Sequence, residues 1–179
     1  DNTFNVLSID NGLVAYYDMK MGSNIVILDD LSKYNNDGIF NSMNYTNYVS
    51  NDYEPLITNT EMYNYLTFDG TNDYIDYGNI SILNFDTTDK FSISFWMNPT
   101  SIGEMQILGK YLNSSNTGYD IWLDNTYSTI KIHIRKTTSN ELKLRAEASK
   151  ISAGTWAHIV WTYDGTATNA GTNIYIDTY

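Results

Sequence analysis

Large apolar and polar side chains alternate along the stretch from Thr155 to Tyr163. One set of alternate positions holds Ala157, Ile159, Trp161 and Tyr163, and the other holds Trp156, His158, Val160 and Thr162. A period of two is the spacing of a β-strand, whose successive side chains point to opposite faces of a sheet. Because bulky residues occupy both sets, we expect a central strand with both of its faces covered.

Turn residues follow this strand at Asp164-Gly165. A polar stretch over 169–173 then leads to a second apolar segment, 174–176, which begins a partner strand. His158 stands in the middle of the first strand between bulky neighbours. We therefore expect it to be packed and hydrogen-bonded rather than to bind a metal.

Similar short segments recur along the chain and are bounded by Gly, Asn and Asp. The strands predicted from them cover 12–19, 39–40, 65–68, 74–77, 91–97, 107–108, 119–123, 129–136 and 141–148. The sequence shows no helix-length window with apolar residues three and four apart, so we predict only one short helical turn, between Asn79 and Lys90. Residues 41–61 are polar and tyrosine-rich and are predicted to form a long surface loop. Together these features predict an all-β fold, an antiparallel two-sheet β-sandwich.

The segments 129–136 and 141–148 are predicted to pair as a hairpin. Three isoleucines alternate with Lys131, His133 and Arg135 in the first segment, and two leucines alternate with Glu141, Lys143 and Arg145 in the second. Opposed residues of an antiparallel pair share a face, so the connecting loop must have an odd length, at 137–139 or 138–140. The outer face then carries a basic stripe, on which His133 is expected to be solvated.

The chain has 179 residues, no cysteine and a formal net charge of -11 at pH 7. Its length suits one domain with a good core. The negative charge disfavours binding to nucleic acid and anionic lipid, and no apolar run is long enough to span a bilayer. We therefore expect no nucleic-acid partner and no direct membrane insertion. An acidic surface is compatible with bound divalent cations, although solubility alone accounts for it.

Several segments, taken in order, resemble the laminin G-like, concanavalin A-like jelly-roll superfamily. They are GLVAYY at 12–17, the Asp30-x-Ser loop with Asn36-Asp37-Gly38, LTFDG at 66–70 with DYI at 73–75, FSISFWMNP at 91–99, ILGK at 107–110, Gly118-Tyr119 and GTWAHIVWTYDG at 154–165. The resemblance implies two antiparallel sheets packed face to face, one of them concave. It places the jelly-roll domain at 12–179, after a lead-in segment at 1–11, and implies an extracellular or cell-surface location.

Members of the superfamily continue past the position of 173–177 with a hairpin and a last strand that returns beside the first. The present chain ends at Tyr179, so we expect the jelly roll to lack its last C-terminal strands here. The alternative is that another chain completes the domain by donating a strand.

Calcium is the ligand that the oxygen-rich loops favour, because Ca²⁺ takes about six to eight oxygen ligands from carboxylates, amides and backbone carbonyls. The resemblance suggests a structural ion near Asp30 and the backbone at Asn36 and Asp37. A second oxygen-rich turn contains Asp69 and Asp73. The alternative is that Asp and Asn occupy these loops for turn geometry alone.

Sugar binding on this fold uses aromatic rings that stack on pyranose faces, together with planar polar side chains. The candidate rings are Tyr45, Tyr48, Tyr53, Tyr63, Trp122 and Tyr127. The alternative is that these rings are ordinary exposed tyrosines of a tyrosine-rich sheet, or that they cover a sheet edge.

A glycoside hydrolase needs two carboxyl groups about 5–10 Å apart. Glu141 and Glu147 share a strand face, but six residues at about 3.3 Å each place them about 20 Å apart. The sequence shows no legible Ser/His/Asp arrangement, no cysteine nucleophile and no glycine-rich phosphate loop. We therefore expect no enzyme, although carboxylates from separate strands could still meet.

The leading hypothesis is a non-catalytic extracellular recognition or adhesion module, which binds a glycan or a protein on a cell surface or matrix. The first alternative is the structural outer domain of a surface filament, appendage or phage fibre, with copies of the chain or filament neighbours as partners. The second alternative is a glycoside hydrolase or lyase. Fold alone does not decide among them.

Overall fold

The computed structural model describes residues 12–17, 27–43, 48–50, 64–112, 117–137 and 140–179. These residues form antiparallel β-sheets and two short 3-10 turns, η2 (Ser81–Leu83) and η3 (Asn169–Gly171). The predicted all-β fold is confirmed, and η2 lies where one helical turn was expected. No helix among these residues has the length and apolar character needed to cross a membrane.

The chain divides into two compact units, Asp1–Ile82 and Leu83–Tyr179. The first contains the short strands β1 (Ile27–Leu28), β2 (Gly38–Asn41), β3 (Tyr48–Ser50), β4 (Asn64–Leu66) and β5 (Tyr74–Asp76). β2 pairs with β1 and β5, and β3 pairs with β4, all antiparallel. The domain boundaries predicted at 1–11 and 12–179 stay a prediction.

Two predictions for the first unit are corrected. The strand predicted at 12–19 is wrong in its described part, because 12–17 contains no strand. There the backbone N–H of Tyr16 donates to the side chain of Asp30 instead of to a neighbouring strand. The loop predicted over 41–61 is wrong where it includes β3, whereas 44–47 and 51–61 lie outside the described residues.

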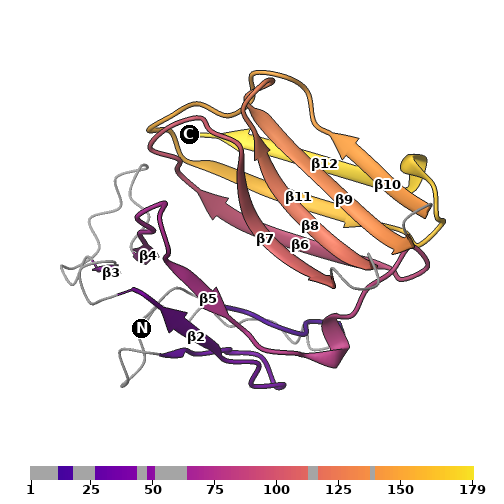
Figure 1. The fold of residues 1–179 in the computed structure, drawn as a ribbon, viewed down its shortest axis with the longest axis horizontal. Coiled ribbons are helices and arrows are strands. Elements are labelled where there is room, and N and C mark those ends of the chain that lie inside the picture. The colour runs from indigo at the N-terminus through magenta and orange to yellow at the C-terminus, as the bar shows by residue number, and fades with distance from the viewer. Residues whose placement is uncertain (1–11, 18–26, 44–47, 51–63, 113–116, 138–139) are drawn as a thin grey trace, which may run out of the picture. The chain divides into compact units, whose positions relative to one another are not determined.

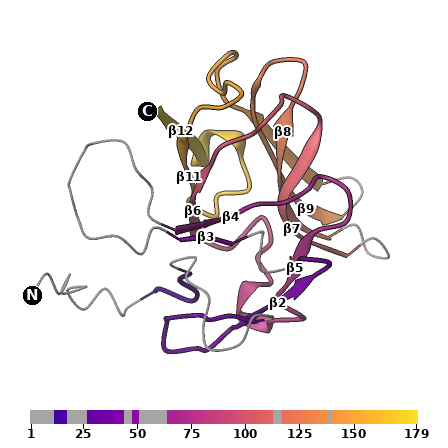
Figure 2. The same ribbon diagram turned by 90° about the vertical axis from the view of Figure 1, so that its left-hand side faces the viewer.

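The second unit is built from two antiparallel sheets that pack face to face (Figure 1). The first sheet has the strand order β12 (Thr172–Thr178), β11 (Ala157–Tyr163), β6 (Phe91–Met97). The second has the order β10 (Asn140–Arg145), β9 (Thr129–Thr137), β8 (Thr117–Asp124), β7 (Met105–Leu112). Figure 2 shows the two layers from the side, with β6 and β11 on one side and β8 and β9 on the other.

The core lies between these two sheets and comes from the alternation of side chains along each strand. Most inward residues of β8, β9 and β11 are buried, namely Tyr119, Ile121, Leu123, Ile130, Ile132, Ile134, Ala157, Ile159, Trp161 and Tyr163. Each large apolar side chain removed from water contributes about 1.5–3 kcal/mol before conformational entropy is deducted. This burial determines which faces of the two sheets point away from the core.

The inward set of β11 is therefore confirmed, whereas the expected full cover of its other face is wrong. Val160 and Thr162 on that face are only half-buried. His158 is packed as predicted, because its ring stacks on Trp96 at a centroid distance of 4.7 Å. Its Nε2 lies 2.8 Å from the hydroxyl oxygen of Ser94, within hydrogen-bond distance.

The register of the β9–β10 hairpin is also confirmed. Glu141 lies opposite Arg135, Lys143 opposite His133, and Arg145 opposite Lys131. This is the register of the 137–139 loop, with polar residues opposing polar residues. An irregularity between Asn140 and Glu141 shifts the pairing at the hairpin end.

Candidate functional site

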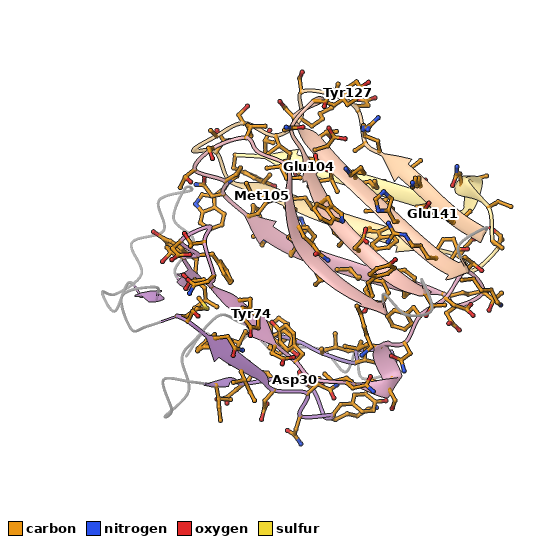
Figure 3. The ribbon with its side chains drawn as sticks, viewed as in Figure 1. Asp30, Tyr74, Glu104, Met105, Tyr127 and Glu141 are labelled. Carbon is orange, nitrogen blue, oxygen red and sulfur yellow. The ribbon has the colours of Figure 1, made fainter. Side chains whose placement is uncertain are left out.

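The outward face of the β7–β10 sheet carries a concentration of charged and aromatic side chains, which we call the charged face. Its residues are Glu104, Gln106, Tyr111, Asp120, Trp122, Asp124, Tyr127, Lys131, His133, Arg135, Glu141, Lys143 and Arg145. Glu104, Tyr127 and Glu141 mark its extent in Figure 3. Strand register creates this grouping, because directly opposed residues on neighbouring strands share a face.

Three strands contribute to the centre of the charged face. Asp120 on β8 lies opposite His133 on β9, and His133 lies opposite Lys143 on β10. Asp120 and His133 are both buried, and the Nδ1 of His133 is 2.7 Å from Oδ1 of Asp120. Arg135 donates through Nη1 to the other carboxylate oxygen of Asp120.

The imidazole of His133 has two neighbours at the same nitrogen. Nη2 of Arg135 lies 2.7 Å from Nδ1 of His133, and Oδ1 of Asp120 is equally close. A guanidinium only donates and an ionised carboxylate only accepts, so one Nδ1 atom cannot satisfy both. We assign the proton to Nδ1 and the hydrogen bond to Asp120, because this pairing satisfies a buried carboxylate.

Arg135 extends this network to the edge strand. Its Nε donates to Oε1 of Glu141 at 2.7 Å, and Nζ of Lys143 lies 2.9 Å from Oε2 of the same carboxylate. Its guanidinium also lies over the ring of Tyr111, 4.8 Å from the centroid. Gly118 on β8 stands opposite both Arg135 and Tyr111, so no side chain separates them.

A second cluster forms where β8 ends. Asp124 accepts hydrogen bonds at Oδ1 from the backbone N–H groups of Thr126 and Tyr127, at 3.0 and 3.3 Å. Its Oδ2 accepts from Nε of Arg145 at 2.8 Å, and Arg145 lies 4.1 Å from the ring centroid of Tyr127. One buried carboxylate thus fixes both the turn and the position of the Tyr127 ring.

The third cluster joins β7, β8 and β9. Lys131 forms an ion pair with Glu104, and its Nζ lies 5.7 Å from the ring centroid of Trp122. Trp122 stands opposite both Lys131 and Gln106. Three rings of the charged face, Tyr111, Trp122 and Tyr127, therefore each lie beside a cation, as cation–π contacts require.

Three carboxyl groups of the charged face, those of Asp120, Asp124 and Glu141, have lowered pKa values. Burial alone would raise the pKa of Asp120, but hydrogen bonds and charges from His133 and Arg135 outweigh it and lower that pKa. The same balance lowers the pKa of Asp124, through Arg145, and the pKa of Glu141, through Lys143 and Arg135. A general acid for glycoside cleavage needs a raised pKa, which none of these three groups has.

The loop around Asp30 in the first unit uses its carboxylate for internal hydrogen bonds. Oδ1 accepts from the backbone N–H groups of Tyr16 and Ser32, and Oδ2 accepts from the hydroxyl of Ser32 and the N–H of Asn36, all at 2.8 Å. The backbone N–H of Asp30 donates to Oδ1 of Asp37 at 2.9 Å. Burial would raise the pKa of Asp30, but these hydrogen bonds lower it.

The loop containing Asp69 and Asp73 is likewise held by local hydrogen bonds. Oδ1 of Asp69 accepts from the backbone N–H groups of Thr71 and Asn72, at 2.7 and 3.2 Å. The N–H of Asp69 donates to Oδ2 of Asp73 at 2.9 Å. These contacts match the turn role that Asp commonly has in loops.

Comparison with known families bears on the second unit most directly. Residues 69–178, more than half of the chain, match the sequence profile of the concanavalin A-like lectin/glucanases superfamily, laminin G type. The chain belongs to this superfamily. The resemblance stated from sequence segments is thereby confirmed, and the two packed sheets of the second unit are those of a concanavalin A-like β-sandwich.

One solved structure extends the comparison beyond the matched range. It is the crystal structure of residues 221–444 of an S-layer domain-containing protein from Clostridium thermocellum ATCC 27405. This concanavalin A-like chain superposes on it with a TM-score of 0.57 and 20% identity, over 90% of this chain and 67% of that one. At this identity the likeness shows the fold. The sequence has no match among curated proteins.

The predicted sugar-binding residues of this concanavalin A-like chain fall in different places. Trp122 and Tyr127 both belong to the charged face. Tyr48 lies in β3, and its side chain is outside the described part of the chain. The other three candidates, Tyr45, Tyr53 and Tyr63, lie outside the described residues.

The predicted metal ligands fall in two separate loops, one with Asp30, Asn36 and Asp37 and the other with Asp69 and Asp73. Within the described ranges, no three His, Cys, Asp or Glu side chains group closely enough to hold a metal ion. Asn36 uses its amide to donate to the carbonyl of Val14 at 2.7 Å. Calcium binding at these residues stays a prediction.

One prediction for the outer face of β9 is wrong. His133 is buried and bound to Asp120 rather than solvated. The sequence pattern identified Glu141 and the basic residues of β9 and β10, but not the buried partners Asp120 and Asp124 on β8. The signal was present, because Asp120 and Asp124 flank Trp122 at alternate positions and so share its face.

Proposed function

We propose that this concanavalin A-like chain is a non-catalytic extracellular recognition module that binds a glycan on the charged face. One observation carries the proposal. Trp122 and Tyr127 border a single sheet face whose polar side chains are already fixed by hydrogen bonds among Asp120, His133 and Arg135. A glycan site needs ring faces for stacking and polar groups in fixed positions for hydroxyl groups, and this face offers both.

The pre-set positions of the polar groups favour binding, because less side-chain freedom is lost when a ligand arrives. Arg135 is held by Asp120, Glu141 and the ring of Tyr111. Arg145 is held by Asp124 and Tyr127. The side chains of Arg145 and Glu141 are 42% and 24% exposed, and they retain donor and acceptor positions for sugar hydroxyls.

The lowered pKa values support a non-catalytic role. Asp120, Asp124 and Glu141 are ionised at neutral pH, whereas hydrolysis of a glycosidic bond needs one protonated carboxyl group beside one ionised one. Arg135 binds both Asp120 and Glu141, which favours ionisation of both. The pair therefore suits hydrogen bonding to a ligand better than proton transfer.

The extracellular location and a second candidate function rest on the comparisons. The matched solved structure belongs to a protein described as S-layer domain-containing. This favours a cell-surface location, and it also favours a structural role as an outer domain of a surface assembly. That structural role predicts self-association without glycan binding.

A glycan array probed with the purified 179-residue chain tests the proposal, once in calcium and once in chelator. We expect binding that weakens about two- to tenfold in Trp122→Ala, from the typical energy of one aromatic contact. Trp96→Ala is the matched control, because Trp96 lies in β6 on the outward face of the other sheet. Loss in chelator alone would direct attention to Asp30. Failure to bind any glycan would refute the recognition role, and light scattering would then test self-association.

A further inference from the structure

Every cationic side chain of the charged face lies beside a carboxylate of the same face. Its cations are Lys131, Arg135, Lys143 and Arg145, and its carboxylates are Glu104, Asp120, Asp124 and Glu141. Each cation lies within ion-pair distance of at least one of these carboxylates. The four cations and the four carboxylates cancel in formal charge, although the whole chain carries -11 at pH 7.

A charged ligand would disturb this arrangement. An anion that bound Arg135 or Arg145 would compete with the buried carboxylates of Asp120 and Asp124. A cation that bound those carboxylates would compete with the same two guanidinium groups. Separating a buried ion pair is costly, because each charge is then buried without a partner. The free-energy penalty of an unpaired buried charge exceeds the stability that the intact pair contributed.

An uncharged polyol does not have to separate any pair. The side chains of Glu104, Lys143 and Arg145 are partly exposed, so hydroxyl groups can add hydrogen bonds there without displacing an ion-pair partner. Tyr111 and Tyr127 are 37% and 44% exposed as residues, which leaves apolar surface for the C–H face of a pyranose. The net negative charge of the chain also repels polyanions at low ionic strength.

We propose that the charged face selects an uncharged saccharide and discriminates against uronic acids, sulfated sugars and amino sugars. This inference rests on the proposed glycan-binding function and assigns its ligand class. Trp122, Tyr111 and Tyr127 supply the stacking surface. The ion pairs act as specificity-determining groups, because their mutual neutralisation removes attraction for charged sugars.

Hexasaccharides that differ in charge test the inference with the full 179-residue chain. The probes are hexamers of β-1,4-glucose, β-1,4-mannose, α-1,4-galacturonate and β-1,4-glucosamine, measured by calorimetry at moderate salt. We expect a neutral hexamer to bind more tightly than either charged hexamer. Tighter binding of the galacturonate or glucosamine hexamer would overturn the inference and leave glycan recognition standing. Failure of all four would overturn the inference, and the glycan array would then decide whether glycan recognition stands.

Charge variants test whether the ion pairs set the selectivity. Glu104→Gln and Glu141→Gln each remove one negative charge from the face, so each should raise the affinity for the galacturonate hexamer severalfold relative to the affinity for the neutral hexamer. Asp177→Asn removes the same charge from β12 in the other sheet and serves as the matched control. Circular dichroism checks that each variant is folded. Equal behaviour of the face variants and the control would overturn the inference, as would a neutral-hexamer affinity unaffected by Trp122→Ala.

Discussion

The Nδ1 atom of His133 lies 2.7 Å from Oδ1 of Asp120, and both side chains are buried on the charged face. Because the ionised carboxylate only accepts, Nδ1 carries a proton and donates it in this hydrogen bond. Oδ2 of Asp120 also accepts a hydrogen bond from Nη1 of Arg135. One carboxylate therefore orients the two central side chains of β9.

Removing the imidazole should destabilise the protein. In His133→Ala, Asp120 stays buried but loses one of its two side-chain donors. We expect the free energy of unfolding to fall by about 1–3 kcal/mol, the cost of leaving a buried polar group without a partner. Urea denaturation measures it, and Lys143→Ala is the control. The ion pair of Lys143 is exposed, so its loss should change stability by no more than about 0.5 kcal/mol. Equal effects of the two variants would contradict the prediction.

Acid should weaken the fold, and the direction follows from the pKa values. The pKa values of Asp120, Asp124 and Glu141 are lower in the folded chain than their ordinary values. The unfolded chain therefore binds more protons in acid, and stability rises with pH across that range. We expect a constant free energy of unfolding from neutral pH to about pH 5, then a decrease as the pH falls through the ordinary carboxyl values of about 4.

Urea titrations at a series of pH values from about 3 to 7 measure this dependence. Asp124→Asn should have lower stability at neutral pH and a shallower loss in acid, because one of the titrating groups has been removed. A variant that kept the full acid slope would show that Asp124 does not contribute to it.

Strand alternation predicted more of the fold than of the candidate site. The alternation in β11 and β9 correctly placed Trp161 and Ile132 in the core, because the inward face of a strand can be recognised from the apolar residues of that strand alone. His133 was misplaced because its environment depends on Asp120, which lies on another strand. A pattern within one strand does not show what the next strand places opposite it. Likewise, the apolar residues at 12–17 suggested a strand, but Tyr16 bonds to the side chain of Asp30.

The Asp30 loop should depend on both oxygens of its carboxylate. In Asp30→Asn, one oxygen becomes an amide NH₂, which cannot accept from Ser32 or Asn36. We expect the backbone amides that lose their acceptor to exchange their hydrogens faster. NMR measures this exchange. Asp69→Asn is the control, because only Oδ1 of Asp69 accepts the Thr71 and Asn72 amides, and an amide oxygen can replace it. Unchanged exchange in Asp30→Asn would contradict the assigned role of the carboxylate.

Gly118 should be irreplaceable where β8 meets β7. Its φ is +119°, a backbone conformation that side chains disfavour, and a Cβ there would overlap the backbone carbonyl of Lys110. Gly154 has a φ of +74°, and beyond its chain neighbours no atom lies within 4 Å of the place that a Cβ would take. Gly154→Ala should therefore lower the free energy of unfolding only by the cost of placing an alanine in a left-handed backbone conformation, about 1–2 kcal/mol.

In Gly118→Ala, the overlap with the Lys110 carbonyl adds to this backbone cost. Urea denaturation should therefore show a larger decrease in the free energy of unfolding than for Gly154→Ala. It should also weaken glycan binding, because Gly118 stands between Arg135 and Tyr111. Equal costs for the two glycine variants would show that β7 moves aside without penalty.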